Sequence, residues 1–173
     1  MVSKVDSEFT SACEEVESVL ENLQQTSAAA DKYILQIAEI KRLTALLYFH
    51  ENLGEITAVQ HIPPSSLPLY NSPKGSKQKL VSSIIDLIST LPNPDTASVL
   101  WPLYVIGHST MLEDEVQRRF VLERLHNIQK TRNLGSVRAA RMAVERAFRI
   151  KDLEFPSGRK DGARQEKWVI SLA

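Results

Sequence analysis

The residue types that could do catalytic or metal chemistry are few in this chain of 173 residues and stand far apart. His50, His61, His108 and His126 include no closely spaced pair of the kind that ligates a metal. Ser109 follows His108, but adjacency in sequence does not supply the geometry that a nucleophile and its base require. The sequence also has no phosphate-binding glycine loop and no nucleophile elbow. We therefore predict a protein that is not an enzyme, with no catalytic residue, no metal and no cofactor.

Cys13 is the single cysteine of the chain. One cysteine cannot form an internal disulfide or a cysteine-rich zinc site within these residues. It falls on the apolar stripe of the first predicted helix, so we expect a small buried hydrophobe and not a reactive thiol.

The charged residues are unevenly distributed, although the formal net charge is zero. Residues 1–62 hold ten acids against four bases, and residues 118–151 hold ten bases against two acids. We expect the two halves of one fold to attract each other; the alternative is a surface for a polyanion. The candidate basic contact face consists of Arg118, Arg119, Arg138, Arg141 and Arg149.

The composition is that of one globular domain over residues 1–173, with 43% hydrophobic and 24% charged residues. The longest apolar run, residues 99–107, is far shorter than the roughly 20 residues that a membrane-spanning helix needs. The first residues lack the apolar stretch of a secretory signal. We expect a soluble, intracellular protein that does not bind membranes.

Apolar residues in the first half recur every three or four positions, which predicts amphipathic helices. The first helix would bury Phe9, Cys13, Val16, Leu20 and Leu23. A second, from about 28 to 51 after a break at Thr26 and Ser27, would bury Ile37, Ile40, Leu43 and Leu47. A third, from about 77 to 91, would bury Leu80, Ile84, Leu87, Ile88 and Leu91. The Pro- and Ser-rich residues 52–76 predict a long surface loop.

The most apolar helix is expected to start at Asn93-Pro94 and to carry Pro102 in its interior. Pro102 has no N–H to donate to the carbonyl of Ser98, so the helix should kink or start afresh there. We interpret Trp101 as a core anchor and not as a ligand-stacking residue.

Two long helices follow. Thr110 and Glu113 have the spacing of a capping box for the first of them. Gly135 would end it in a left-handed turn, and Ser136 would cap the next helix. Their predicted inward residues are Leu112, Val116, Phe120, Val121, Leu125 and Ile128, then Val137, Ala140, Val144, Ala147 and Phe148. With a partly extended tail over 152–173, the prediction is an irregular all-α array of about six helices without a substantial sheet.

The order of these motifs resembles a known family. The residues concerned are Leu100-Trp101-Pro102-Leu103 with Gly107, then Arg119-Phe120 with Arg124 and Ile128, then Leu134-Gly135-x-Val137 with Ala140. Together they are similar to the C-terminal part of the fungal-specific transcription factor domain, the regulatory middle-homology region of zinc binuclear-cluster transcription factors. The resemblance covers residues 95–150, and its structural signature is Leu100, Trp101, Pro102, Gly107, Phe120 and Gly135.

This resemblance implies an all-helical regulatory region in the nucleus, which regulates transcription through effector or partner contacts. The implied partners are other proteins of the transcription machinery, or a second copy of the chain. The family reads DNA with a six-cysteine zinc cluster, which a single cysteine cannot form. DNA would therefore be reached only through a module outside these residues, and we expect the chain to be a fragment of a longer regulatory domain.

Two alternatives remain open. Residues 115–150 have the outline of a DNA-binding helix-turn-helix, although the first helix is long for that motif and the arginines lie on both helices. The chain could instead be a stand-alone helical scaffold that binds other proteins through an exposed apolar groove.

Overall fold

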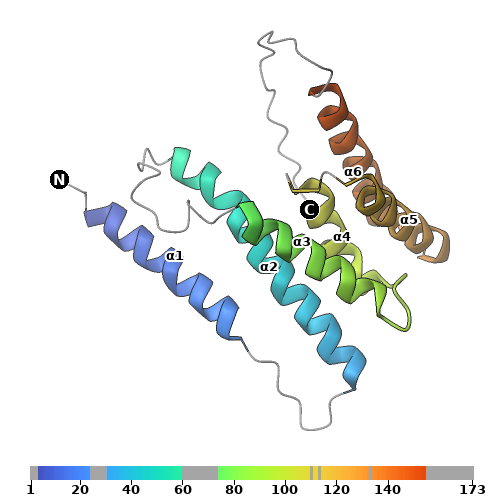
Figure 1. Cartoon of the computed structure of the whole chain (residues 1–173), viewed down its shortest axis with the longest axis horizontal. Helices are drawn as coiled ribbons and strands as arrows, with labels where there is room; N and C mark the ends of the chain where they lie inside the picture. Colours follow the sequence, from blue (N-terminus) through green and yellow to red (C-terminus); the bar gives the residue numbers. More distant parts are fainter. Residues whose placement is uncertain are drawn as a thin grey trace.

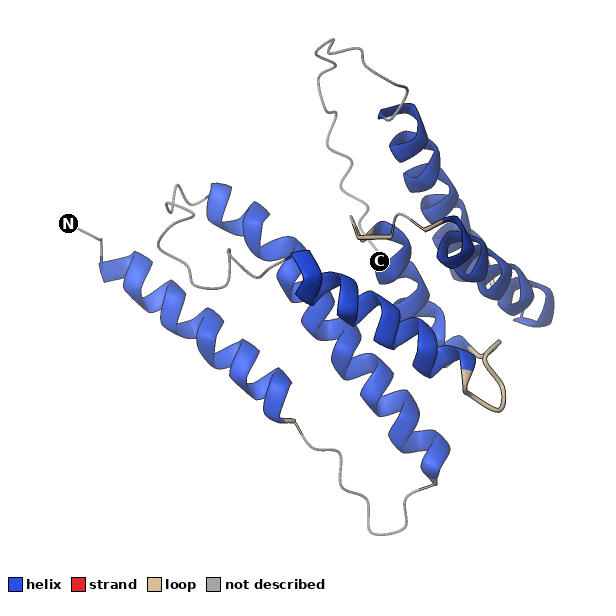
Figure 2. Cartoon of the chain, viewed as in Figure 1, coloured by secondary structure: helices blue, strands red, loops and turns tan. Residues whose placement is uncertain are grey.

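The computed structural model of the chain describes residues 4–23, 31–59, 74–109, 111–112, 114–132 and 134–154. These residues form α-helices and one 3-10 turn and contain no strand, so the all-α prediction is confirmed (Figure 2). The elements are α1 (Lys4–Asn22), α2 (Lys32–Val59), α3 (Lys74–Ser89), a 3-10 turn (Ala97–Val99), α4 (Leu100–His108), α5 (Glu115–Arg132) and α6 (Gly135–Glu154).

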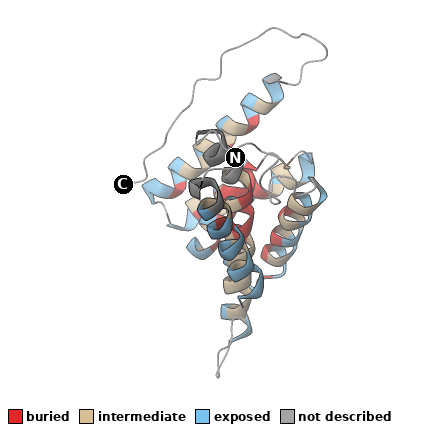
Figure 3. Ribbon diagram, turned by 90° about the vertical axis from the view of Figure 1, so that its left-hand side faces the viewer, coloured by how far each residue is buried: buried red, intermediate tan, exposed pale blue. Residues whose placement is uncertain are grey.

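The short helix α4 occupies the middle of the molecule. It contacts α2 on one side and α5 and α6 on the other, while α2 also contacts α1 and α3 (Figure 1). The buried residues gather at the centre, between these helices (Figure 3). Leu103 and Ile106 of α4 are completely buried there, so α4 is the interior segment that the sequence predicts.

The predicted inward faces are largely confirmed. The main core contains Ile40, Leu47, Ile84, Ile88, Val121, Leu125, Ile128, Val137, Val144 and Phe148, all at expected positions. Cys13 is buried as predicted, but it belongs to a separate small cluster with Phe9 and Phe49. Burial raises the pKa of the Cys13 thiol, and the charge of Glu14 adds to that effect, so the thiol is a poor nucleophile.

Three residues predicted to be inward are exposed. Val16 of α1 and Leu23, just after that helix, are 45% and 44% exposed, and Val116 of α5 is 74% exposed. Helix α1 packs chiefly against α2, so only one side of it is covered. Val116 lies in the first turn of α5, where the helix has just begun.

Two aspartates determine where α2 and α5 begin. The Asp31 carboxylate accepts a hydrogen bond from the N–H of Tyr33 at 3.0 Å, and that of Asp114 accepts one from the N–H of Val116 at 2.9 Å. The predicted start of the second helix near residue 28 is therefore wrong. Helix α5 does not start at Met111, because Met111 and Leu112 are not helical; the predicted capping box joins Thr110 and Glu113, which both lie outside the described residues.

The predicted loop over 52–76 is too long at both ends. Helix α2 continues through Gly54 to Val59, and α3 already begins at Lys74. A glycine inside a helix costs only about 1 kcal/mol, and the first proline of this stretch comes later, at Pro63. At the other end of the chain, α6 extends to Glu154, beyond the predicted start of the tail at 152. The rest of the loop and of the tail lies outside the described residues.

Pro102 marks the start of a helix and not a kink inside one. Residues 93–96 are not helical, so the predicted start at Asn93-Pro94 is wrong. The 3-10 turn ends at Val99 and α4 begins at Leu100, which places Pro102 in the first turn. The N–H groups of a first turn have no partner within their helix, so the missing donor of proline does no harm there.

Gly135 is the first residue of α6, and its φ angle lies outside the left-handed region. The carbonyl of Leu134 accepts hydrogen bonds from the N–H groups of Val137 and Arg138, at 3.1 and 3.3 Å. The helix thus begins one residue before Ser136, so the predicted left-handed turn at Gly135 and the predicted cap at Ser136 are both wrong.

Candidate functional site

Helices α4 and α6 are in close contact at Gly107. A Cβ atom at this position would lie 2.7 Å from both methyl carbons of Val144. Val144 is completely buried and β-branched, so it cannot swing aside. Gly107 of the predicted signature therefore allows the backbone of α4 to contact α6 directly.

Nearer the start of α4, the same two helices leave an open apolar pocket of about 230 Å³. Its walls are Leu100, Trp101 and Tyr104 of α4, together with Ser136, Ala139, Ala140 and Ala143 of α6. The small side chains of α6 stand opposite the aromatic side chains of α4 and leave the space unfilled. We call it the Trp101 pocket.

Trp101 lies at the edge of this pocket with 41% of its surface exposed, so the core-anchor interpretation is wrong. The interior side of α4 is taken by Leu103 and Ile106. Successive residues of a helix are about 100° apart, so a residue two positions before Leu103 faces away from it. The indole lies 6.4 Å from the ring of Tyr48 of α2, at a tilt of 57°.

The size and polarity of the Trp101 pocket limit what it can bind. Pockets for drug-sized ligands typically hold about 300–1,000 Å³, whereas an apolar cavity of about 150 Å³ can hold benzene. The hydroxyls of Ser136 and Tyr104 and the indole N–H of Trp101 are the polar side-chain groups among its lining residues. It therefore suits one large apolar side chain or one small apolar molecule.

The arginines of the predicted basic face lie mostly in a second, wider groove between α5 and α6. Arg118 and Arg119 of α5 and Arg141 and Arg149 of α6 line this groove of about 650 Å³. Arg138 is exposed on α6 and is not among the lining residues.

The charges in this groove are balanced. Its lining also includes the four acids Glu115, Glu123, Glu145 and Asp152. Arg118 pairs with Asp152 at 2.5 Å and Arg141 with Glu145 at 2.7 Å, while Arg141 also donates to the side-chain oxygen of Gln129. A phosphate would have to compete with these carboxylates, so the groove offers little attraction to a polyanion.

The histidines and Ser109 are separated in space. His50 forms a hydrogen bond with the Glu17 carboxylate at 2.7 Å, and His108 lies against Tyr104. His126 lines the groove between α5 and α6, and His61 lies outside the described residues. In the described ranges, no three His, Cys, Asp or Glu side chains gather as they would around a metal ion.

Ser109 takes part in polar contacts that sequence reasoning missed. Its hydroxyl donates to the Glu51 carboxylate at 2.7 Å, and its carbonyl accepts a hydrogen bond from Lys151. These contacts connect α2, the end of α4 and α6, and no local motif signals them.

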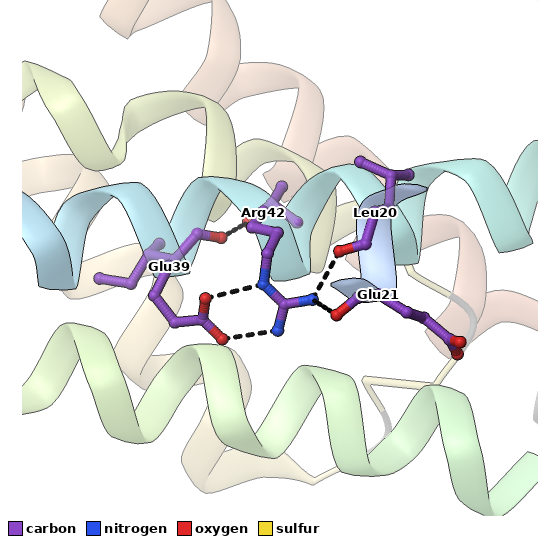
Figure 4. Close-up of polar contacts among 6 residues, drawn as sticks. Leu20, Glu21, Glu39 and Arg42 are labelled. Atoms are coloured by element: carbon purple, nitrogen blue, oxygen red, sulfur yellow. Dashed lines mark hydrogen bonds and ion pairs between the residues drawn. The ribbon is translucent and has the colours of Figure 1, made fainter. Parts of the chain in front are cut away.

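Arg42 of α2 makes a second such connection, to α1. Its guanidinium forms two hydrogen bonds with the Glu39 carboxylate, at 2.6 and 2.7 Å (Figure 4). The same group donates to the carbonyl oxygens of Leu20 and Glu21 at the end of α1, at 2.7 and 3.4 Å. A cation at the carbonyl end of a helix also interacts favourably with the helix dipole.

These features define a helical domain whose open site suits apolar contacts and which presents no cluster of catalytic groups in the part that the structure describes. A family model described as the fungal specific transcription factor domain matches residues 3–164. The chain belongs to this family, and the resemblance inferred from its sequence is confirmed. The family assigns it to transcription regulation.

No curated protein and no solved structure matches the chain. None of the helices in the described ranges combines the length and the apolar character needed to cross a bilayer.

Proposed function

We propose that this chain is a nuclear regulatory region that acts by contacting another protein of the transcription machinery, and that the contact is made at the Trp101 pocket. The observation that carries the proposal is an apolar pocket on the surface, bordered by a tryptophan that is 41% exposed. Tryptophan side chains seated in or beside pockets contribute a large share of the binding free energy at protein interfaces.

The dimensions of the site favour a protein partner. A pocket of about 230 Å³ accepts one anchoring side chain, such as Leu or Phe. Its two walls are helices, which hold their side chains in a fixed arrangement before a partner arrives. Such preorganisation lowers the conformational entropy lost on binding.

DNA reading by residues 115–150 is less well supported. Helices α5 and α6 have 18 and 20 residues, and the four arginines that line the groove between them stand beside four acids. The proposal assigns DNA reading to a zinc-cluster module outside these residues, and the regulatory contact to this chain.

A reporter assay tests the proposal. The full chain would be fused to an unrelated DNA-binding module in a fungal host with a matching reporter. Ala139→Leu and Ala143→Leu should fill the pocket and move reporter output several-fold towards that of the DNA-binding module alone. Ala97→Leu is the matched control, because Ala97 is exposed and does not line the pocket.

Circular dichroism would establish that all three variants remain helical. Reporter output from both pocket variants equal to that of the Ala97→Leu control would overturn the proposal. Binding of the chain alone to duplex DNA, with an affinity that falls steeply as salt rises, would favour the helix-turn-helix alternative.

A further inference from the structure

The two ends of the molecule carry opposite charges. Helix α1 contains six acids and one base, whereas α5 and α6 together contain ten bases and five acids. Helix α1 packs chiefly against α2, and α6 packs against α4 and α5, so α1 and α6 lie at opposite ends (Figure 1). The attraction expected between the acidic and basic halves is therefore not satisfied between these two helices.

Helix α1 presents an apolar stripe to solvent. Val16 and Val19 are 45% and 57% exposed and stand three residues apart, and Leu23, which directly follows the helix, is 44% exposed. Residues with this spacing share one face of a helix. Glu15 is exposed four residues before Val19 and so shares this face of the helix, which is therefore apolar and acidic.

Helix α6 presents the complementary combination. Met142, Ile150 and Leu153 are 53%, 45% and 75% exposed along its outer side. Arg138 and Arg149 are exposed on the same helix. The outer surface of α6 is therefore apolar and basic.

We propose that the outer surface of α1 in one copy of this chain docks on the outer surface of α6 in a second copy. Charge selects this pairing, because two α1 surfaces would bring glutamates together and two α6 surfaces would bring arginines together. Such a pair retains one unused α6, on the first copy, and one unused α1, on the second. A head-to-tail contact of this kind adds further copies and does not stop at a dimer unless a ring closes.

The contact is weak by its nature. A single pair of helices buries much less than the roughly 1,200–2,000 Å² of a stable interface. Salt also screens charges on exposed surfaces beyond about 10 Å at 0.1 M ionic strength. The association should therefore need a high protein concentration and low salt.

Sedimentation velocity on the full chain tests the proposal. At low salt the average mass should rise with concentration above the 19.5 kDa of one copy, and at high salt it should return towards that value. The variant Glu15→Lys should remain monomeric, and so should Arg138→Glu/Arg149→Glu. The control Lys79→Glu/Asp86→Lys, on exposed positions of α3, should associate as the wild type does.

Mixing the two monomeric variants provides the decisive measurement. The lysine on α1 of one variant then meets the glutamates on α6 of the other, and the unaltered α6 of the first meets the unaltered α1 of the second, so association should return. A wild-type chain that stays at the mass of one copy at low salt would overturn the proposal, and so would a mixture that stays monomeric. Loss of association in Trp101→Ala alone would also overturn it, because Trp101 is on neither surface. Binding of α1 only to a basic helix of another protein would overturn it as well, because the partner would then not be a second copy.

Discussion

Gly107 and Gly135 belong to the same resemblance, yet their surroundings differ. A Cβ at Gly107 would overlap Val144, whereas a Cβ at Gly135 would meet nothing within 4 Å. The first glycine is required by the contact between two helices. The second begins a helix on the exposed surface, where other small residues would serve equally well.

Gly107→Ala should lower the free energy of unfolding. Alanine gains about 1 kcal/mol of helix propensity, but overpacking a filled core costs about 1–3 kcal/mol, so we expect a net loss of up to about 2 kcal/mol. Urea unfolding followed by circular dichroism would measure it. Gly135→Ala is the matched control and should be neutral or stabilising by about 0.4–1 kcal/mol. A Gly107→Ala variant as stable as the wild type would show that Val144 can give way.

The sequence predicted which residues are apolar and helical better than it predicted which are covered. Val137, Val144 and Phe148 are inward as expected, because α6 packs against both α4 and α5. Trp101 stays 41% exposed because the small side chains of α6 leave a pocket beside it, and Val116 is 74% exposed in the first turn of α5. Periodicity identifies a stripe on a helix, but the position of neighbouring helices decides whether that stripe is buried.

At the level of helices, Arg42 connects α1 to α2 through two different kinds of acceptor. The Glu39 carboxylate holds its guanidinium in place, and the carbonyl oxygens of Leu20 and Glu21 receive its remaining donors. The hydrogen bond from Arg42 lowers the pKa of the Glu39 carboxyl below its usual 4.5, although burial of the carboxyl opposes this shift.

Arg42→Met should destabilise the chain, and the size of the effect should depend on pH. Loss of the hydrogen bonds to charged groups should cost about 1–3 kcal/mol at pH 7. Because the pKa of Glu39 is lowered in the folded state, its share of that stabilisation is present above about pH 4.5 and is lost as pH falls further. The difference between variant and wild type should therefore shrink in acid but not vanish, since the carbonyl contacts do not titrate.

Urea unfolding at pH 7 and at pH 3.5 would measure this difference. Lys41→Met is the control, since Lys41 is exposed on the same helix. A difference that stays constant over this range would exclude a contribution from the Glu39 carboxylate.

The existence of the helices was predicted better than their ends. Each start has several residues that could cap it, such as Thr26 and Asp31 before α2, or Thr110 and Asp114 before α5. In both cases the structure uses the later residue. A sequence reveals which side chains can accept a hydrogen bond from a free backbone N–H, but the path of the chain decides which of them lies close enough to do so.

On the scale of the whole molecule, α1 is attached less firmly than the other helices. Its apolar contact is the small cluster around Cys13, separate from the main core that α2 to α6 share. Its other described contacts with α2 are polar, at His50 and Arg42.

Hydrogen exchange should therefore be faster in α1 than in α4 or α6. Local opening of α1 breaks few apolar contacts, so it needs less free energy than opening of the core. Exchange followed by mass spectrometry on the intact chain would resolve the helices, with the buried residues Leu103, Val105 and Ile106 as an internal reference. Equal protection of α1 and α4 would mean that α1 unfolds only with the whole molecule.

The fold class and the family were predictable because residues 99–149 carry both the helical periodicity and an ordered set of motifs. The Trp101 pocket was not predictable. Its walls come from two helices about 35 residues apart in sequence, and it exists because Ala139, Ala140 and Ala143 leave room opposite Trp101. A pocket between two helices cannot be predicted from the sequence pattern of either helix alone.

The Gly107 contact also has a consequence for regulation. It lies six residues from Trp101, about 9 Å along the axis of α4, so the same two helices that are in contact at Gly107 also border the Trp101 pocket. A ligand that pushes α4 and α6 apart at Trp101 must therefore strain the contact between Gly107 and Val144. By thermodynamic reciprocity, a substitution that crowds the contact at Gly107 must alter the affinity of the Trp101 pocket for its ligand. The single methyl group added by Gly107→Ala would then change the affinity of the pocket without contacting the ligand.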